Sequence, residues 1–167
     1  METRTKWRLC YILLAITLIN IVTASQEIMV NLSKSFRAKL IECQKELNIP
    51  DHIMQDFYNF WKEEYELVNK ELGCAIICIA SKHDLMSEDR MHHGKATEFA
   101  KKHGADDDTA KQIVNLIQEC EKGFEAERDF CVKALEVAKC FRTRIHELKW
   151  APTIEMVLEE VISEVQE

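Results

Sequence analysis

Six cysteines are the residues in this sequence whose type and spacing most directly predict chemistry. The chain has seven cysteines in 167 residues, and six follow the apolar N-terminal segment, at positions 43, 74, 78, 120, 131 and 140. An even number in an exported chain predicts disulfides, here three, each stabilising the domain by about 2–4 kcal/mol. A metal site is the alternative, but zinc sites favour short cysteine pairs with further His or Cys nearby. Because only Cys74 and Cys78 are that close, we expect disulfides and no metal.

The N-terminal residues 1–24 have the pattern of a secretory signal peptide. Basic residues among the first eight precede a long apolar run, and Ala24 suits cleavage just before Ser25. A retained membrane anchor is the alternative, which Asn20 and the cleavage-like end of the run argue against. The mature chain, residues 25–167, is expected to be one secreted domain.

Charge and motifs exclude several classes of function. The net charge is −7, with 29 acidic against 22 basic residues, so clustered cations for binding nucleic acid are missing. His83-Asp84 raises the possibility of a phospholipase of the A2 type, but four glycines cannot supply its calcium loop, and no other hydrolase motif is present. A saposin-like membrane protein is disfavoured by its different cysteine spacing and by the acidic charge. We therefore expect no catalytic residues, and not an enzyme.

Apolar residues recur at helical spacing through most of the chain. The pattern is clearest over 106–122, where three aspartates at the start also favour a helix N-terminus. The expected helices cover 26–46, 51–65, 69–82, 95–102, 106–122 and 128–147. No segment predicts a strand, and the polar stretch 82–94 is expected to be a loop. The fold class is therefore all-α.

Helical geometry restricts the pairing of the cysteines. Cys74 and Cys78 lie on one face of their helix, so a bond between them would be awkward. Cys131 and Cys140 are nine residues apart, about 180° around a continuous helix, and cannot bond each other. These two restrictions leave about ten of the fifteen possible pairings open.

The cysteine spacing resembles that of insect odorant-binding proteins, in particular the pheromone-binding proteins of moths. Three residues separate Cys74 from Cys78, and eight separate Cys131 from Cys140. The segments that carry the same resemblance are 56–62 (DFYNFWK), 73–78 (GCAIIC), 92–94 (HHG), 98–106 (EFAKKHGAD) and 150–152 (WAP). The resemblance covers residues 25–165.

This resemblance implies six to seven helices around a closed apolar cavity, with disulfides Cys43–Cys78, Cys74–Cys131 and Cys120–Cys140. It implies a carrier without a cofactor, which solubilises a long-chain volatile alcohol, acetate or aldehyde in the lymph of an antennal sensory hair. The expected partners are that ligand and an olfactory receptor or the neuronal membrane surface, with the carrier a monomer or a pH-dependent homodimer. A general carrier of plant volatiles is the alternative.

The resemblance also implies which residues bind the ligand. They are mostly apolar and come from several helices: Met29, Phe36, Phe60, Trp61, Ile76, Ala80, Phe99, Val114, Ile117, Val137 and Phe141. Without the resemblance, the same residues are ordinary core. Ala80 stands where alcohol-binding members often have serine, so Trp61 or Lys133 is expected to meet a polar head group. A solvated surface lysine is the alternative for Lys133.

Two groups of titratable residues are expected to control release. The tail 153–167 is amphipathic, and protonation of its glutamates Glu155, Glu159 and Glu164 would let it enter the cavity and expel the ligand. A tail packed permanently outside, or used for dimerisation, is the alternative. The resemblance implies that His92 and His93 latch a loop over the cavity and loosen it when protonated, and a simply solvated histidine pair is the alternative. Gln118 replaces a histidine that is common in the family.

Overall fold

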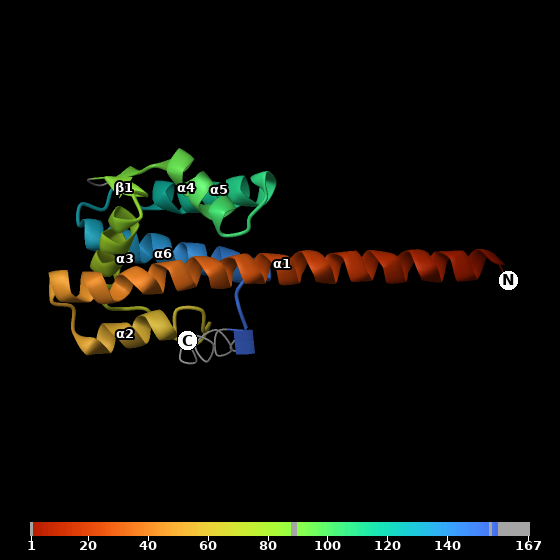
Figure 1. Ribbon diagram of the computed structural model, residues 1–167, viewed down its shortest axis with the longest axis horizontal. Helices are drawn as coiled ribbons and strands as arrows, with labels where there is room; N and C mark the ends of the chain where they lie inside the picture. The colour runs from red at the N-terminus through yellow and green to blue at the C-terminus, as the bar shows by residue number, and fades with distance from the viewer. Residues whose placement is uncertain (1, 88–89, 154, 157–167) are drawn as a thin grey trace.

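A computed structural model describes residues 2–87, 90–153 and 155–156 of the chain. These residues are mostly helical (Figure 1), as their repeated apolar spacing predicts. The elements in chain order are α1 (Glu2–Leu47), α2 (Asp51–Tyr58), α3 (Lys70–Lys82), β1 (Met86–Ser87), β2 (Arg90–Met91), α4 (His93–Lys102), α5 (Asp107–Gly123) and α6 (Phe130–Glu147). The prediction of an all-α fold with six to seven helices is therefore confirmed, with six helices among the described residues.

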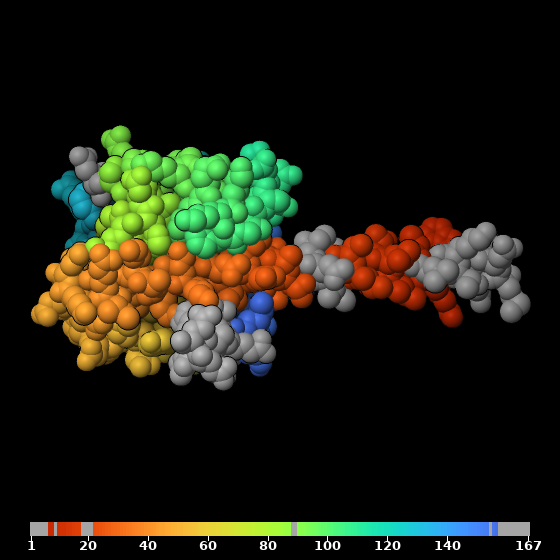
Figure 2. Space-filling model, viewed as in Figure 1, coloured from red at the N-terminus to blue at the C-terminus, as the bar shows by residue number. Residues whose placement is uncertain are grey.

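Helix α1 is continuous, and it combines the apolar N-terminal segment with the helix expected over 26–46. Its first part projects from the rest of the molecule (Figure 2), and Trp7 and Tyr11 are 66% and 65% exposed. Burial begins at Ser25, which is 4% exposed. Within the described residues, Cys10–Leu47 is the one stretch that is long and apolar enough to cross a membrane, a test that signal sequences also pass.

Several elements differ from the sequence predictions. Helix α2 ends at Tyr58, where the predicted helix continues to residue 65. The expectation of no strand is wrong, because β1 and β2 form a two-stranded antiparallel ladder in which Met86 pairs with Met91. Strands of two residues are too short to show an alternating pattern in a sequence. Helix α4 begins at His93, two residues before the predicted start.

The three disulfides are those that the family resemblance implies, so that prediction is confirmed. They join α1 to α3, α3 to α6, and α5 to α6, through Cys43–Cys78, Cys74–Cys131 and Cys120–Cys140 respectively. Helix α6 is continuous between its two cysteines, so it is bonded to α3 and to α5 from opposite sides.

Helices α3 and α6 approach each other closely at Gly73. A Cβ atom at this position would lie 1.8 Å from the carbonyl oxygen of Cys131 and 3.0 Å from the backbone nitrogen of Leu135. The neighbouring disulfide holds the Cα atoms of Cys74 and Cys131 4.5 Å apart. Only glycine leaves room for this packing, because its neighbours are backbone atoms that cannot rotate away.

Aspartate side chains cap the first turns of α5 and α6. Asp106 accepts a hydrogen bond of 2.7 Å from the backbone N–H of Thr109, and this bond is the main cause that lowers the pKa of the Asp106 carboxyl. Asp129 accepts from the backbone N–H groups of Cys131 and Val132. Such caps satisfy N–H groups that have no partner within the helix.

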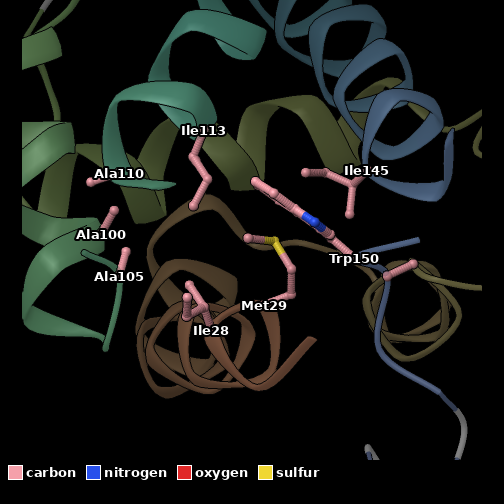
Figure 3. Close-up of a cluster of buried hydrophobic side chains, with 9 residues drawn as sticks. Ile28, Met29, Ala100, Ala105, Ala110, Ile113, Ile145 and Trp150 are labelled. Carbon is pink, nitrogen blue, oxygen red and sulfur yellow. The ribbon is translucent and has the colours of Figure 1, made fainter. Parts of the chain in front are cut away.

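The buried core consists of three apolar clusters. In the first (Figure 3), Ile28 and Met29 of α1 pack against Ile113 of α5, Ile145 of α6 and the ring of Trp150. The second joins α1, α2, α3 and α6, and the third lies around Ala80, Leu85, Ala96 and Val114. Members of all three clusters also line one internal cavity.

Candidate functional site

An apolar cavity of about 660 Å³ lies between the helices. Every described helix contributes to its wall, as do the segment 59–62, both strands, and Pro152 and Thr153. Carbon and sulfur atoms dominate the wall. A cavity of this size and character suits one mostly apolar small molecule, which it would shield from water on most sides.

The structure places all eleven predicted ligand-binding residues on this wall. They are Met29 and Phe36 on α1, Phe60 and Trp61 after α2, Ile76 and Ala80 on α3, Phe99 on α4, Val114 and Ile117 on α5, and Val137 and Phe141 on α6. Residues from six separate parts of the chain are thus brought together around one volume. Their contact with a ligand stays a prediction.

A hydrogen-bonded pair interrupts the apolar wall near Trp61. The indole Nε1–H of Trp61 donates to the hydroxyl of Ser33 over 2.9 Å, and that hydroxyl donates to the carbonyl oxygen of Met29 over 2.8 Å. The indole N–H expected to meet a polar head group is therefore already used inside the protein. Ser33 was not among the predicted site residues, although its position four residues after Met29 places it on the same helix face.

The wall also includes five charged residues: Lys34, Arg37, Lys62, Glu121 and Lys133. Among the described residues, the Lys133 ammonium has no acidic partner within ion-pair distance, so its head remains available to an oxygen atom. Glu121, which the sequence argument missed, has a carboxylate oxygen 3.4 Å from Nε2 of His93. His93, predicted to act in release, is thus close to a group on the cavity wall.

Two histidines lie behind the cavity wall formed by Phe36 and Phe99. The His83 ring is stacked on Phe36, with 5.6 Å between the ring centroids. The centroid of Phe99 lies 4.9 Å from that of His83 and 4.3 Å from that of His103. Nε2 of His83 is 3.1 Å from the carbonyl oxygen of Ser35. Burial lowers the pKa of His83, and the positive charges of nearby groups act in the same direction. The fold therefore disfavours protonation of His83.

The segment after α2 is not helical because α6 supplies its hydrogen bonds. The Arg142 guanidinium Nη1 donates to the carbonyl oxygens of Phe60, Lys62 and Tyr65, over 3.3, 3.3 and 2.9 Å. These bonds replace part of the helical ladder that the sequence pattern predicts up to residue 65. They also fix the segment that brings Phe60 and Trp61 to the wall.

Further bonds hold the two ends of the same segment. Nε2 of His146 lies 3.0 Å from the carbonyl oxygen of Trp61. The fully buried Asp56 carboxylate accepts from the Tyr65 hydroxyl over 2.7 Å and from the Asn69 amide over 2.8 Å. The hydrogen bond to Asp56 raises the pKa of Tyr65. The cavity wall at Trp61 therefore rests on a connected polar network.

The residues predicted to control release lie in two places. His92 precedes α4 and donates its backbone N–H to the carbonyl oxygen of Leu85 over 2.7 Å, which joins the residues that flank the β1–β2 ladder. Glu155 is exposed, and hydrogen bonds with its own backbone and with Thr153 lower the pKa of its carboxyl. Glu159 and Glu164 lie outside the described residues.

The sequence of the chain matches the model of a known protein family. The model of the PBP/GOBP family matches residues 25–144. The chain belongs to the PBP/GOBP family. Membership of this family of binding proteins confirms the prediction that the chain is not an enzyme.

Individual members of the PBP/GOBP family share most of the chain. Pheromone-binding protein 2 of Epiphyas postvittana is 43% identical over 155 residues, which are 93% of this chain and 94% of that protein. General odorant-binding protein 2 of Bombyx mori is 36% identical over 137 residues, 81% of this chain and 86% of that protein. The crystal structure of Epiphyas postvittana pheromone binding protein 3 has 53% sequence identity and a TM-score of 0.62, and the match covers 67% of this chain and 97% of that one.

Proposed function

We propose that this PBP/GOBP chain is a secreted carrier of a long-chain hydrophobic pheromone, an alcohol, acetate or aldehyde. It keeps the ligand in solution in sensillar lymph and releases it at acidic pH near the receptor neuron. The observation that carries this proposal is the cavity of about 660 Å³, lined by side chains from every described helix. The relative named as a pheromone-binding protein, 43% identical, supports the pheromone reading.

The free energy of burying apolar surface in this cavity favours a ligand with a long hydrocarbon chain and few polar atoms. Each buried methylene contributes roughly 0.8 kcal/mol before the costs of association. Phe36, Phe60, Phe99 and Phe141 offer broad apolar surfaces on several sides of the cavity. A chain of about sixteen carbons therefore obtains useful affinity from burial alone, and a single polar contact is enough to orient it.

Lys133 is the proposed contact for the polar head of the ligand. Its position on the wall, without an acidic partner among the described residues, favours an acetate or aldehyde oxygen as acceptor. The methyl group of Ala80 offers no hydroxyl to an alcohol, and the Trp61 indole is bonded to Ser33. An alcohol therefore has fewer partners here than an acetate or an aldehyde.

Release at acidic pH is proposed to use the tail and the residues before α4. Trp150, Ala151 and Pro152 are buried against the body, so the tail starts at the cavity wall. Its glutamates are charged and hydrated at neutral pH, and protonation removes the cost of burying them. His92 and His93 stand at the start of α4, and they are the other groups proposed to respond to acid.

Export follows from the N-terminal segment in this proposal. Residues 1–24 form the signal peptide, and both the burial of α1 and the match to the family model start at residue 25. The released chain, residues 25–167, would then deliver its ligand to an olfactory receptor or the neuronal membrane surface, as a monomer or a pH-dependent homodimer.

Native mass spectrometry tests the proposal directly. Protein exported by insect cells from the full-length chain is delipidated and offered an equimolar panel of long-chain alcohols, acetates, aldehydes and plant terpenoids, at pH 7 and pH 5. We expect one C14–C18 compound to be held at pH 7 and lost at pH 5. No binding at either pH contradicts the carrier function.

Two variants test the finer parts of the proposal. A chain that ends at residue 152 should hold the ligand equally at both pH values, and an unchanged pH dependence contradicts the role of the tail. Lys133→Met should lower affinity for the acetate or aldehyde, whereas Lys45→Met, an exposed lysine at the end of α1, should not. Equal binding of all head groups by Lys133→Met removes the proposed contact.

A general carrier of plant volatiles is the second candidate. General odorant-binding protein 2 of Bombyx mori, which is 36% identical to this chain, supports it. Both candidates share the cavity and the disulfides, so they differ in the molecule that is preferred. Selection of a terpenoid from the panel at pH 7 would favour the general carrier over the pheromone carrier.

A further inference from the structure

Two methionines form one patch of the cavity wall. Met86 of β1 and Met91 of β2 are direct partners in the antiparallel ladder, so their side chains project to the same face of the ribbon. Both line the cavity and pack against the cluster around Leu85 and Ala96. Their thioether groups therefore form adjoining parts of the surface that a ligand would touch.

The two methionines of this patch are partly exposed to solvent. Met86 and Met91 are half-buried, and the other ladder pair, Ser87 and Arg90, is exposed. Two strands of two residues each give the hairpin few hydrogen bonds of its own. A small water-soluble reagent can therefore reach these sulfur atoms more readily than a sulfur atom in the helical core.

The other described methionines differ from this pair in burial or in position. Met29 also lines the cavity but is 1% exposed, with its sulfur enclosed between α1, Ile113 and Trp150 (Figure 3). Met54 on α2, which packs against the second apolar cluster, and Met156 after Pro152 are half-buried like the pair, but neither lines the cavity. The chain thus contains a shielded wall methionine and an accessible methionine outside the wall, both of which serve as internal references.

We propose that Met86 and Met91 are an oxidation site through which a hydroperoxide lowers the affinity of the cavity for apolar ligands. This inference rests on the proposed carrier function. The thioether sulfur attacks one oxygen of hydrogen peroxide, a sulfur–oxygen bond forms, and the O–O bond breaks. The sulfur is oxidised by two electrons to a sulfoxide, and the peroxide is reduced, its second oxygen leaving as water.

The sulfoxide changes the wall because its oxygen is a strong hydrogen-bond acceptor. Methionine sulfoxide is polar, whereas the thioether that it replaces is apolar and adaptable. A ligand chain packed against the oxidised patch would bury the sulfoxide oxygen without a donor, and Ala80, Leu85 and Val114 nearby supply none. If the side chains turn toward water instead, the wall loses two apolar contacts. Both routes weaken binding.

The test compares binding before and after mild oxidation. Protein exported by insect cells from the full-length chain is treated with hydrogen peroxide, and peptide mass spectrometry measures sulfoxide at each methionine. Affinity is measured by fluorescence of N-phenyl-1-naphthylamine and by displacement with hexadecyl acetate. We expect Met86 and Met91 to be oxidised well before Met29, with affinity falling about fivefold or more. Methionine sulfoxide reductases should restore it.

Two variants show whether a loss of affinity comes from oxidation of Met86 and Met91 or from oxidation elsewhere in the protein. Met86→Leu/Met91→Leu removes both sulfur atoms and keeps the wall apolar, so whatever its affinity before treatment, that affinity should not fall on treatment with peroxide. Met54→Leu should lose affinity like the parent protein. Should the double variant be poorly folded, the single variants Met86→Leu and Met91→Leu decide the question, because each should lose less affinity on oxidation than the parent protein.

Several results would overturn the inference. They are oxidation of Met29 as fast as of the pair, unchanged affinity after Met86 and Met91 are fully oxidised, and equal loss in the double variant. Untreated protein that binds neither probe contradicts the carrier function itself. That last outcome differs from the others, because in those the untreated protein binds and only the response to peroxide fails.

Discussion

Replacing Gly73 by alanine adds one methyl group at the closest approach of α3 and α6. The new Cβ would lie 1.8 Å from the carbonyl oxygen of Cys131 and 2.8 Å from its carbonyl carbon. Real Cβ atoms essentially never come within 3.0 Å of such neighbours, so the helices must separate by more than 1 Å. The Cys74–Cys131 disulfide, one residue away, opposes that separation by holding the two Cα atoms 4.5 Å apart.

The cost of this substitution follows from the kind of neighbour. Overpacking usually costs 1–3 kcal/mol, and because backbone atoms cannot rotate away, we place Gly73→Ala at about 3 kcal/mol or more. At 2–4 °C per kcal/mol for a chain of this size, the Tm should fall by about 10 °C. The methyl group also gains helix propensity of about 1 kcal/mol, which is too small to offset the clash.

The assay is thermal unfolding, followed by circular dichroism at 222 nm on protein whose disulfides have been verified by mass spectrometry. Gly123→Ala is the matched control, since this glycine ends α5 with nothing within 4 Å of an added Cβ. The control should keep or slightly raise the Tm. A Gly73→Ala protein with native disulfides and a Tm within about 2 °C of the parent, a shift worth less than about 1 kcal/mol, would refute the reasoning.

Three further changes have defined outcomes. Arg142→Gln removes the charged donor for three carbonyl oxygens and should lower the free energy of unfolding by about 2 kcal/mol and speed amide exchange over 60–65. Arg144→Gln, which loses an exposed pair on the same helix, should do neither; equal effects would reject the role of Arg142. The pKa of His83 is lowered by burial, so its stabilising contribution is complete above the unfolded pKa of about 6.5 and is lost as pH falls through the folded pKa. His83→Gln should therefore flatten urea-unfolding free energies between pH 7 and pH 5, and a slope equal to the parent's would contradict this. Serine at both Cys120 and Cys140, a pair 20 residues apart, should cost about 3 kcal/mol in the same urea assay, and a loss below about 1 kcal/mol would show that unfolded-state entropy is not the main effect.

Local patterns predicted the parts of the fold that local forces determine. The helix starting at Asp107 combines a capping aspartate with regular apolar spacing, and both signals are visible within its own residues. Opposite faces of α6 excluded a Cys131–Cys140 bond without any knowledge of tertiary structure. The full pairing and the wall residues came from the family resemblance, because spacing alone left about ten pairings open.

The errors arose where a distant partner replaces a local one. The apolar spacing of 51–65 is helical, yet the helix ends at Tyr58, because the guanidinium of Arg142 satisfies carbonyl groups that a longer helix would use. Ser33 was overlooked because its importance comes from Trp61, 28 residues away. No periodicity in a sequence reports such bonds, since they depend on which helices become neighbours.

The disulfides cross-link some of the elements that line the cavity and leave the others without a covalent link. They connect α1, α3, α6 and α5 in one covalent series, so these four helices cannot separate without breaking a bond. Within the described chain, α2, α4 and the short hairpin have no such link. These unlinked elements are therefore the parts of the described wall that can shift without a covalent cross-link opposing them. In the described chain, hydrogen bonds and apolar packing hold them against the four linked helices.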